Sequence, residues 1–82
     1  MKLPRDLSGA KLAQLLERFG YHIVRQTGSH IRLTTSKVGE HHLTIPAHPT
    51  LRVGTLSGIL RDVAEHFQKS KEEIAGEIFR SS

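Results

Sequence analysis

The chain of 82 residues contains no cysteine, which excludes a disulfide, a thiolate zinc site and a cysteine nucleophile. A domain of this size buries roughly 60–65% of the surface that its unfolded chain exposes, so a thin core must hold without covalent staples. The hydrophobic content of 37% is modest but too high for a disordered chain at this net charge. We therefore expect one small domain over residues 1–82, with no cofactor.

Long apolar runs are also lacking. No segment approaches the roughly 20 apolar residues that a membrane-spanning helix needs. The first ten residues, MKLPRDLSGA, have no apolar core of the kind found in signal peptides. These two absences lead us to expect a cytoplasmic protein that does not engage a membrane.

Acidic residues are scarce in the first three quarters of the chain. Up to Arg61, nine Lys and Arg residues stand against three acidic ones, Asp6, Glu17 and Glu40, which leaves six positive charges in excess. From Asp62 onward, three basic residues stand against five acidic ones. A basic surface most often binds a polyanion such as nucleic acid, although a domain can be basic without such a partner.

Helical periodicity marks three segments. One helix is predicted from Ser8 to Phe19, with Ser8 as its N-cap and Gly20 as the residue that ends it. A second is predicted to start near Thr55, and a third covers about 70–80, opened by an S-x-x-E capping box. Apolar residues at helical spacing form the predicted core stripes: Leu12, Leu15, Leu16 and Phe19; Leu56, Ile59, Leu60, Val63 and Phe67; Ile74 and Ile78.

Three short segments between the helices have the character of β-strands, at residues 21–26, 30–35 and 41–46. The first has apolar residues on both faces, whereas the second alternates cleanly. Gly28 and Gly39 suit the tight turns between them. Strands joined this closely pair antiparallel. The sequence therefore predicts an α+β fold of order α-β-β-β-α, with one further C-terminal helix and with the helices on one face of a three-stranded sheet.

Side-chain alternation divides this predicted sheet into a core face and an open face. The core face carries Ile31, Leu33, Leu43 and Ile45. The open face carries His30, Arg32, Thr34, His42 and Thr44. Such an architecture resembles that of double-stranded-RNA-binding domains.

His30 is the candidate for chemistry, because it follows a Gly-Ser turn and has Arg25 and Arg32 nearby. Histidine side chains exist in both protonation states near neutrality, and guanidinium groups stabilise the charge that a phosphodiester gains in a transition state. A base that takes the 2′-hydroxyl proton of RNA lets that oxygen attack phosphorus, so no protein nucleophile is needed. An ordinary exposed histidine accounts for the same pattern.

Ser29 and the other histidines each allow a structural role as well as a functional one. Ser29 could act as a nucleophile, but a triad serine needs an oriented base, and a backbone bond in the turn is an alternative role. His48 could assist His30 or cap the loop before the second helix. Among the six histidines, His41 and His42 point to opposite faces and no thiolate or Glu motif completes a ligand set, so we expect no metal.

Two longer segments, LSGAKLAQLLERFGYHIVRQTGSHIRL and TIPAHPTLRVGTLSGILR, are similar to the HicA family of toxins, the mRNA interferases of bacterial toxin–antitoxin pairs. The likeness extends from about Leu7 to Val63, within an expected core of residues 7–67. Its most specific elements, in chain order, are Arg25-Gln26, Gly28-Ser29-His30, Ile45-Pro46-x-His48 and Gly54-Thr55-Leu56 ahead of Ile59-Leu60.

The resemblance implies a double-stranded-RNA-binding-like fold, ribonuclease activity on mRNA and a catalytic role for His30. It also implies a HicB-type antitoxin that covers the active surface. The C-terminal segment HFQKSKEEIAGEIFRSS lies outside the recognisable motif, and could dock the antitoxin or a second copy, or simply close the core.

Three interpretations follow from different protein classes. The first is a metal-independent endoribonuclease toxin acting on single-stranded mRNA, with His30 catalytic and with RNA contacts from Arg25, Ser29, Arg32, Lys37 and His48. The second is a non-catalytic RNA-binding module, although GTLSGIL at the second helix lacks the lysines with which such domains hold phosphates. The third is a regulatory protein whose basic face binds an acidic partner. We take the first forward.

Overall fold

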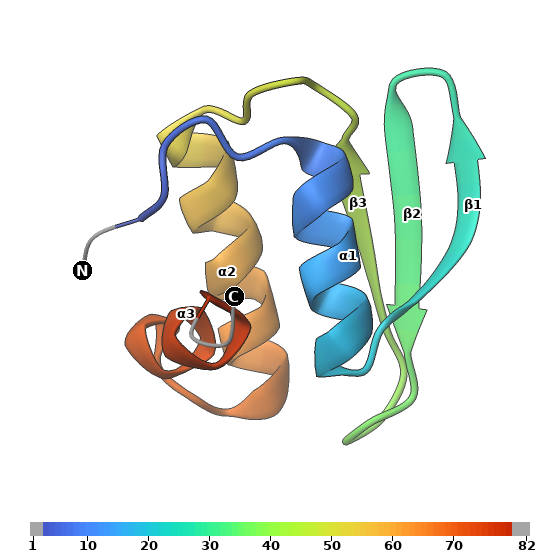
Figure 1. The fold of residues 1–82 in the computed structure, drawn as a ribbon. Helices are drawn as coiled ribbons and strands as arrows, with labels where there is room; N and C mark the ends of the chain where they lie inside the picture. Colours follow the sequence, from blue (N-terminus) through green and yellow to red (C-terminus); the bar gives the residue numbers. More distant parts are fainter. Residues whose placement is uncertain (1–2, 80–82) are drawn as a thin grey trace.

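The computed structural model describes residues 3–79, which form three strands and three helices (Figure 1). In chain order these are α1 (Gly9–Phe19), β1 (His22–Thr27), β2 (His30–Thr35), β3 (His41–Pro46), α2 (Val53–Phe67) and α3 (Lys71–Phe79). The strands pair antiparallel in the order β1-β2-β3. The predicted α+β architecture, with its open three-stranded sheet and added C-terminal helix, is confirmed.

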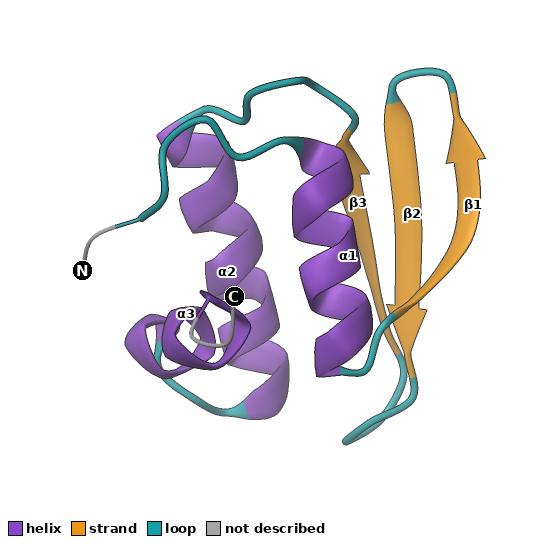
Figure 2. Cartoon of the chain, viewed as in Figure 1, coloured by secondary structure: helices purple, strands orange, loops and turns teal. Residues whose placement is uncertain are grey.

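The helices cover one face of the sheet (Figure 2). α1 contacts all three strands and α2 contacts β3, whereas α3 contacts only the other two helices within the described residues. Ile74 and Ile78 of α3 are buried in the common core. The C-terminal helix therefore closes the core over α1 and α2. Of its predicted range, residue 80 lies outside the described residues.

The helix boundaries follow from local capping. Ser8 Oγ accepts a hydrogen bond from the Lys11 amide at 3.0 Å, and Gly20, with φ of 127°, ends α1. The capping box of α3 is present, because the Glu73 amide donates to Ser70 Oγ at 3.0 Å and the Ser70 amide donates to Glu73 Oε1 at 2.9 Å. The Ser70 amide holds the pKa of Glu73 below its usual value. α2 begins at Val53, two residues before the predicted start, and its N-cap Arg52 makes no side-chain capping bond.

The core lies between the helices and the sheet. The four predicted core-face residues are buried, with exposed fractions of at most 4%: Ile31, Leu33, Leu43 and Ile45. The helical stripes are buried as well, except that Phe19 and Phe67 are only partly covered. Tyr21, predicted as part of the first strand, precedes β1 and lies in the core with 1% of its surface exposed.

β1 is an edge strand and differs most from the prediction. All six of its residues are exposed, including the apolar Ile23 and Val24. Its register with β2 shifts between Ile23 and Arg25, so Val24 is an extra residue in a β-bulge.

Within residues 3–79, no helix has the length and apolar character that crossing a membrane requires.

Candidate active site

The uncovered face of the sheet, called the open face below, presents its side chains in three rows across the strands. The strand pairing gives a first row of Thr27, His30 and Pro46; a second of Arg25, Arg32 and Thr44; and a third of His22, Thr34 and His42. Every predicted open-face residue is on this face, and all are exposed apart from the half-buried Thr34. The predicted division of the sheet into two faces is confirmed for β2 and β3.

No acidic residue occurs in any of the three strands. The nearest carboxylate in sequence is Glu40 in the β2–β3 hairpin, whose Oε2 lies 3.2 Å from His42 Nε2. Within residues 3–79, neither Arg25 nor Arg32 has a carboxylate within ion-pair distance. The open face therefore presents uncompensated positive charge, which attracts polyanions.

The bulge in β1 sets the direction of Arg25. Ile23 lies opposite Leu33 of the core face, so a regular strand would bring Arg25 opposite Ile31 and onto that same face. The extra Val24 moves Arg25 opposite Arg32 instead. The two guanidinium groups consequently lie side by side on the open face. Like charges in directly opposed positions disfavour the pairing unless an anion lies between them.

His30 and the arginines border one depression on the open face. It has a volume of about 230 Å³ and is lined by Arg25, Thr27, His30, Arg32 and Thr44. A phosphodiester seated in it would contact both guanidinium groups and the imidazole. The structure thus brings together the predicted base and two of its predicted phosphate contacts.

Ser29 contacts the His30 ring. Its Oγ lies 3.3 Å from His30 Nδ1. When Nδ1–H donates to this oxygen, Nε2 carries the lone pair that a general base requires. The Ser29 carbonyl also accepts a hydrogen bond from the Ala47 amide at 2.7 Å, which ties the β1–β2 turn to the end of β3. Ser29 thus contacts both the His30 ring and the end of β3.

His48 follows the end of β3 by two residues, and Pro46 at that end pairs with His30, so both histidines lie at the same end of the sheet. His48 does not line the depression. Its carbonyl accepts a hydrogen bond from the Gly9 amide at 3.0 Å, which joins the loop after β3 to the start of α1. Gly9 is needed at this contact, because a Cβ there would lie 1.9 Å from the Pro46 carbonyl oxygen. The His48 side chain is exposed.

Lys37 lies at the opposite end of the sheet. It belongs to the β2–β3 hairpin, and its Nζ donates to the Phe19 carbonyl at 3.3 Å. Thr35, where β2 ends, is already about 17 Å from His30 along the strand. The structure therefore does not bring Lys37 to the phosphate that His30 would act on.

A polar cluster that the sequence did not predict lies beneath this hairpin. Tyr21 Oη is 2.8 Å from His41 Nδ1, and His41 Nε2 is 3.2 Å from Asp62 Oδ1. The His41 ring stacks on His66 with centroids 4.4 Å apart, and His66 Nε2 donates to the Lys37 and Gly39 carbonyls. Burial and then the Asp62 carboxylate raise the pKa of Tyr21. This cluster holds the hairpin against α2.

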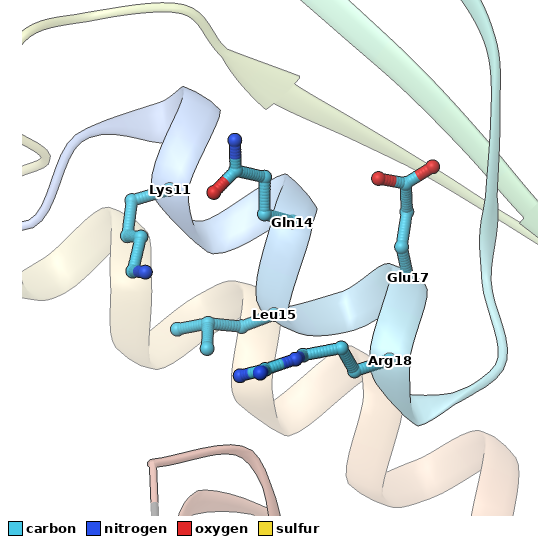
Figure 3. Close-up of a pocket in the computed structure, with 5 residues that line it drawn as sticks. All are labelled: Lys11, Gln14, Leu15, Glu17 and Arg18. Carbon is cyan, nitrogen blue, oxygen red and sulfur yellow. The ribbon is translucent and has the colours of Figure 1, made fainter. Parts of the chain in front are cut away.

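A larger depression, of about 550 Å³, lies over α1 (Figure 3). Its lining residues all come from this one helix: Lys11, Gln14, Leu15, Glu17 and Arg18. Both signs of charge are present and histidine is absent from the lining, so this depression lacks the combination of imidazole and uncompensated arginines found on the open face. No group of three His, Cys, Asp or Glu side chains suited to a metal ion occurs among residues 3–79.

Comparison with known protein families identifies the family of this chain. The sequence profile of the family described as the HicA toxin of bacterial toxin–antitoxin matches residues 9–64. That range begins with α1, includes the whole sheet with Arg25, Ser29, His30 and Arg32, and ends within α2. No curated protein and no solved structure matches the chain. Since the match covers more than half of the chain, the protein belongs to the HicA toxin family of bacterial toxin–antitoxin systems.

Proposed function

We propose that this toxin is a metal-independent endoribonuclease that cleaves single-stranded mRNA in the cytoplasm with His30 as its general base. One observation carries the proposal: His30, Arg25 and Arg32 line the same depression on a sheet face that has no acidic residue in its strands. A proton-transfer group beside paired guanidiniums can promote cleavage by the 2′-hydroxyl of RNA, because it removes the hydroxyl proton while they stabilise the charge gained at phosphorus.

The scissile phosphate sits between Arg25 and Arg32, where it relieves the repulsion of the opposed guanidinium groups. His30 Nε2 takes the 2′-hydroxyl proton, and the O2′–P bond forms as the P–O5′ bond breaks. The leaving 5′ oxygen takes up a proton from solvent. The guanidinium groups stabilise the charge gained on the phosphoryl oxygens. A correctly positioned general base typically raises the reaction rate by ~10²–10⁴-fold.

The remaining predicted contacts fall outside this reaction. Ser29 holds the His30 ring, as its 3.3 Å contact with Nδ1 supports. His48, beyond the edge of the depression, and Lys37, at the far end of the sheet, would reach RNA only away from the scissile linkage.

We also propose that a HicB-type antitoxin neutralises the toxin by covering the open face. An acidic surface on that partner would gain fast association from the uncompensated charge of Arg25 and Arg32. A partner seated there would exclude RNA from the depression.

Product analysis tests the proposal. Wild-type protein is incubated with single-stranded RNA in the presence of EDTA, with His30→Ala as the matched variant. The expected products carry a 2′,3′-cyclic phosphate and a 5′-hydroxyl, and the variant should form almost none. Fragments with 5′-phosphate ends would contradict the mechanism. RNA binding without cleavage by both proteins would instead establish a non-catalytic RNA-binding module.

Growth measurements test the toxin–antitoxin relationship in cells. Expression of the wild-type chain should arrest growth, whereas expression of the His30→Ala form should not. Growth arrest by both proteins would mean that toxicity does not depend on this imidazole.

A further inference from the structure

The third row of the open face carries two imidazoles that the chemistry at His30 does not use. His22 on β1 and His42 on β3 flank Thr34. Both histidines are exposed, and both lie on the face that carries Arg25 and Arg32. His42 contacts Glu40, but the Glu40 side chain is itself 75% exposed, so its carboxylate is free to turn into solvent.

The spacing of the rows suits an extended nucleic-acid backbone. The second row, called the guanidinium row here, and the third, called the histidine row, are two positions apart along β2 and β3, which places them about 6.7 Å apart. On β1 the bulge adds a residue and keeps His22 level with Thr34. Neighbouring phosphates of an extended single strand are separated by one ribose, a comparable distance. Proteins commonly hold single strands in a cationic groove that follows the backbone.

We propose that His22 and His42 form a second phosphate subsite, occupied by the phosphate adjacent to the scissile one. This inference rests on the proposed function, because the scissile phosphate is placed on Arg25 and Arg32. It fixes the path of the substrate: the RNA strand runs along the direction of the β-strands. His30 then acts on one side of the guanidinium row while the neighbouring phosphate is held on the other side.

Only the imidazolium form supplies charge to this subsite. The charged groups that face it are Arg25 and Arg32, one row away, and Glu40 in the hairpin. Among the helices of residues 3–79, none packs against the open face (Figure 2). Since histidine charges between about pH 8 and pH 5, the subsite should strengthen RNA binding in mildly acidic solution and contribute little in alkaline solution.

A binding experiment tests the subsite without depending on cleavage. Affinity for a short single-stranded RNA is measured for His30→Ala and for the same protein with His22→Gln and His42→Gln added. At about pH 6 the added substitutions should weaken binding about fivefold and reduce the slope of log affinity against log salt by about 0.7, the value of one phosphate. At about pH 8 the two proteins should bind alike.

Lys11→Gln in the same His30→Ala background is the control, because it removes a positive charge from α1 and not from the open face. It should leave the affinity nearly unchanged. Equal affinity and equal slope with and without His22 and His42 would overturn the subsite, and so would a loss that is the same at both pH values.

A second arm uses cleavage by the wild-type protein. A neutral methylphosphonate is placed beside the cleaved linkage, on its 5′ side in one RNA and on its 3′ side in another. Only one of the two should slow cleavage, and the His22→Gln/His42→Gln protein should not distinguish them. Equal slowing on both sides would overturn the inferred path. If the wild-type protein cleaves no RNA, the proposed function fails while the binding comparison still decides the subsite.

Discussion

Replacing Arg25 with glutamine should raise the stability of the free protein while lowering its activity. Arg25 and Arg32 are directly opposed on neighbouring strands and have no carboxylate partner within residues 3–79. Like charges in such a pair cost about 0.2–1 kcal/mol. Removal of one charge should therefore stabilise the fold by about 0.5 kcal/mol, which raises Tm by about 2–4 °C for a domain of this size.

The same substitution removes a charged hydrogen-bond donor from the scissile phosphate. Hydrogen bonds to charged groups contribute about 1.5–3 kcal/mol, so kcat/KM should fall about 10- to 150-fold. Thermal unfolding and cleavage rates are measured on the same samples. Added inorganic phosphate should also stabilise the wild type more than the variant, because an anion bound between the two guanidiniums stabilises only the folded state.

Arg18→Gln provides the matched control, since Arg18 is an exposed arginine on α1. It should change neither property appreciably. If Arg25→Gln lowered the stability and left cleavage intact, the assignment of the arginine pair as a phosphate site would be refuted. High salt should shrink the stability gain of Arg25→Gln, because it screens exposed charges.

Three further predictions concern the residues that support the site. Gly9→Ala should destabilise the fold by about 1–3 kcal/mol in denaturant unfolding, because its Cβ would meet the Pro46 carbonyl; an unchanged midpoint would contradict this close contact. Ser29→Ala should lower kcat several-fold and alter the pH profile of kcat with little change in KM. An unchanged pH profile would mean that Ser29 does not position His30. Tyr21 has a raised pKa in the folded state, so stability should be lost as pH rises above about 10, by about 1.4 kcal/mol per pH unit. The absorbance of this single tyrosine should report ionisation only as the protein unfolds, and Tyr21→Phe should remove that slope.

The parts of the fold that sequence reasoning predicted are those where the local pattern is unambiguous. β2 has clean alternation and follows a tight turn, and its predicted bounds and faces agree with the structure. The start of α2 was missed by two residues because Arg52 provides no side-chain cap to mark it. The bulge in β1 was not predicted, because it depends on the pairing with β2 and leaves no local signature in the sequence.

The candidate site was predictable in its residue types but only partly in its arrangement. His30 and Arg32 alternate onto one face of a single strand, which the sequence alone indicates. Arg25 reaches that face only through the bulge. Lys37 lies beyond the far end of β2, so the whole length of that strand separates it from His30. The contact between Tyr21 and His41 joins residues from separate elements, so no local pattern could have revealed it.

In the proposed mechanism, the imidazole of His30 performs the proton transfer on RNA bound at the open face. The most direct test is the single-turnover cleavage rate of wild type and His30→Ala, each at protein concentrations that saturate the same single-stranded RNA. Saturation removes binding from the comparison. The rate of the variant should be lower by about 10²–10⁴-fold, with an unchanged dissociation constant. Equal single-turnover rates would mean that His30 does not perform the proton transfer.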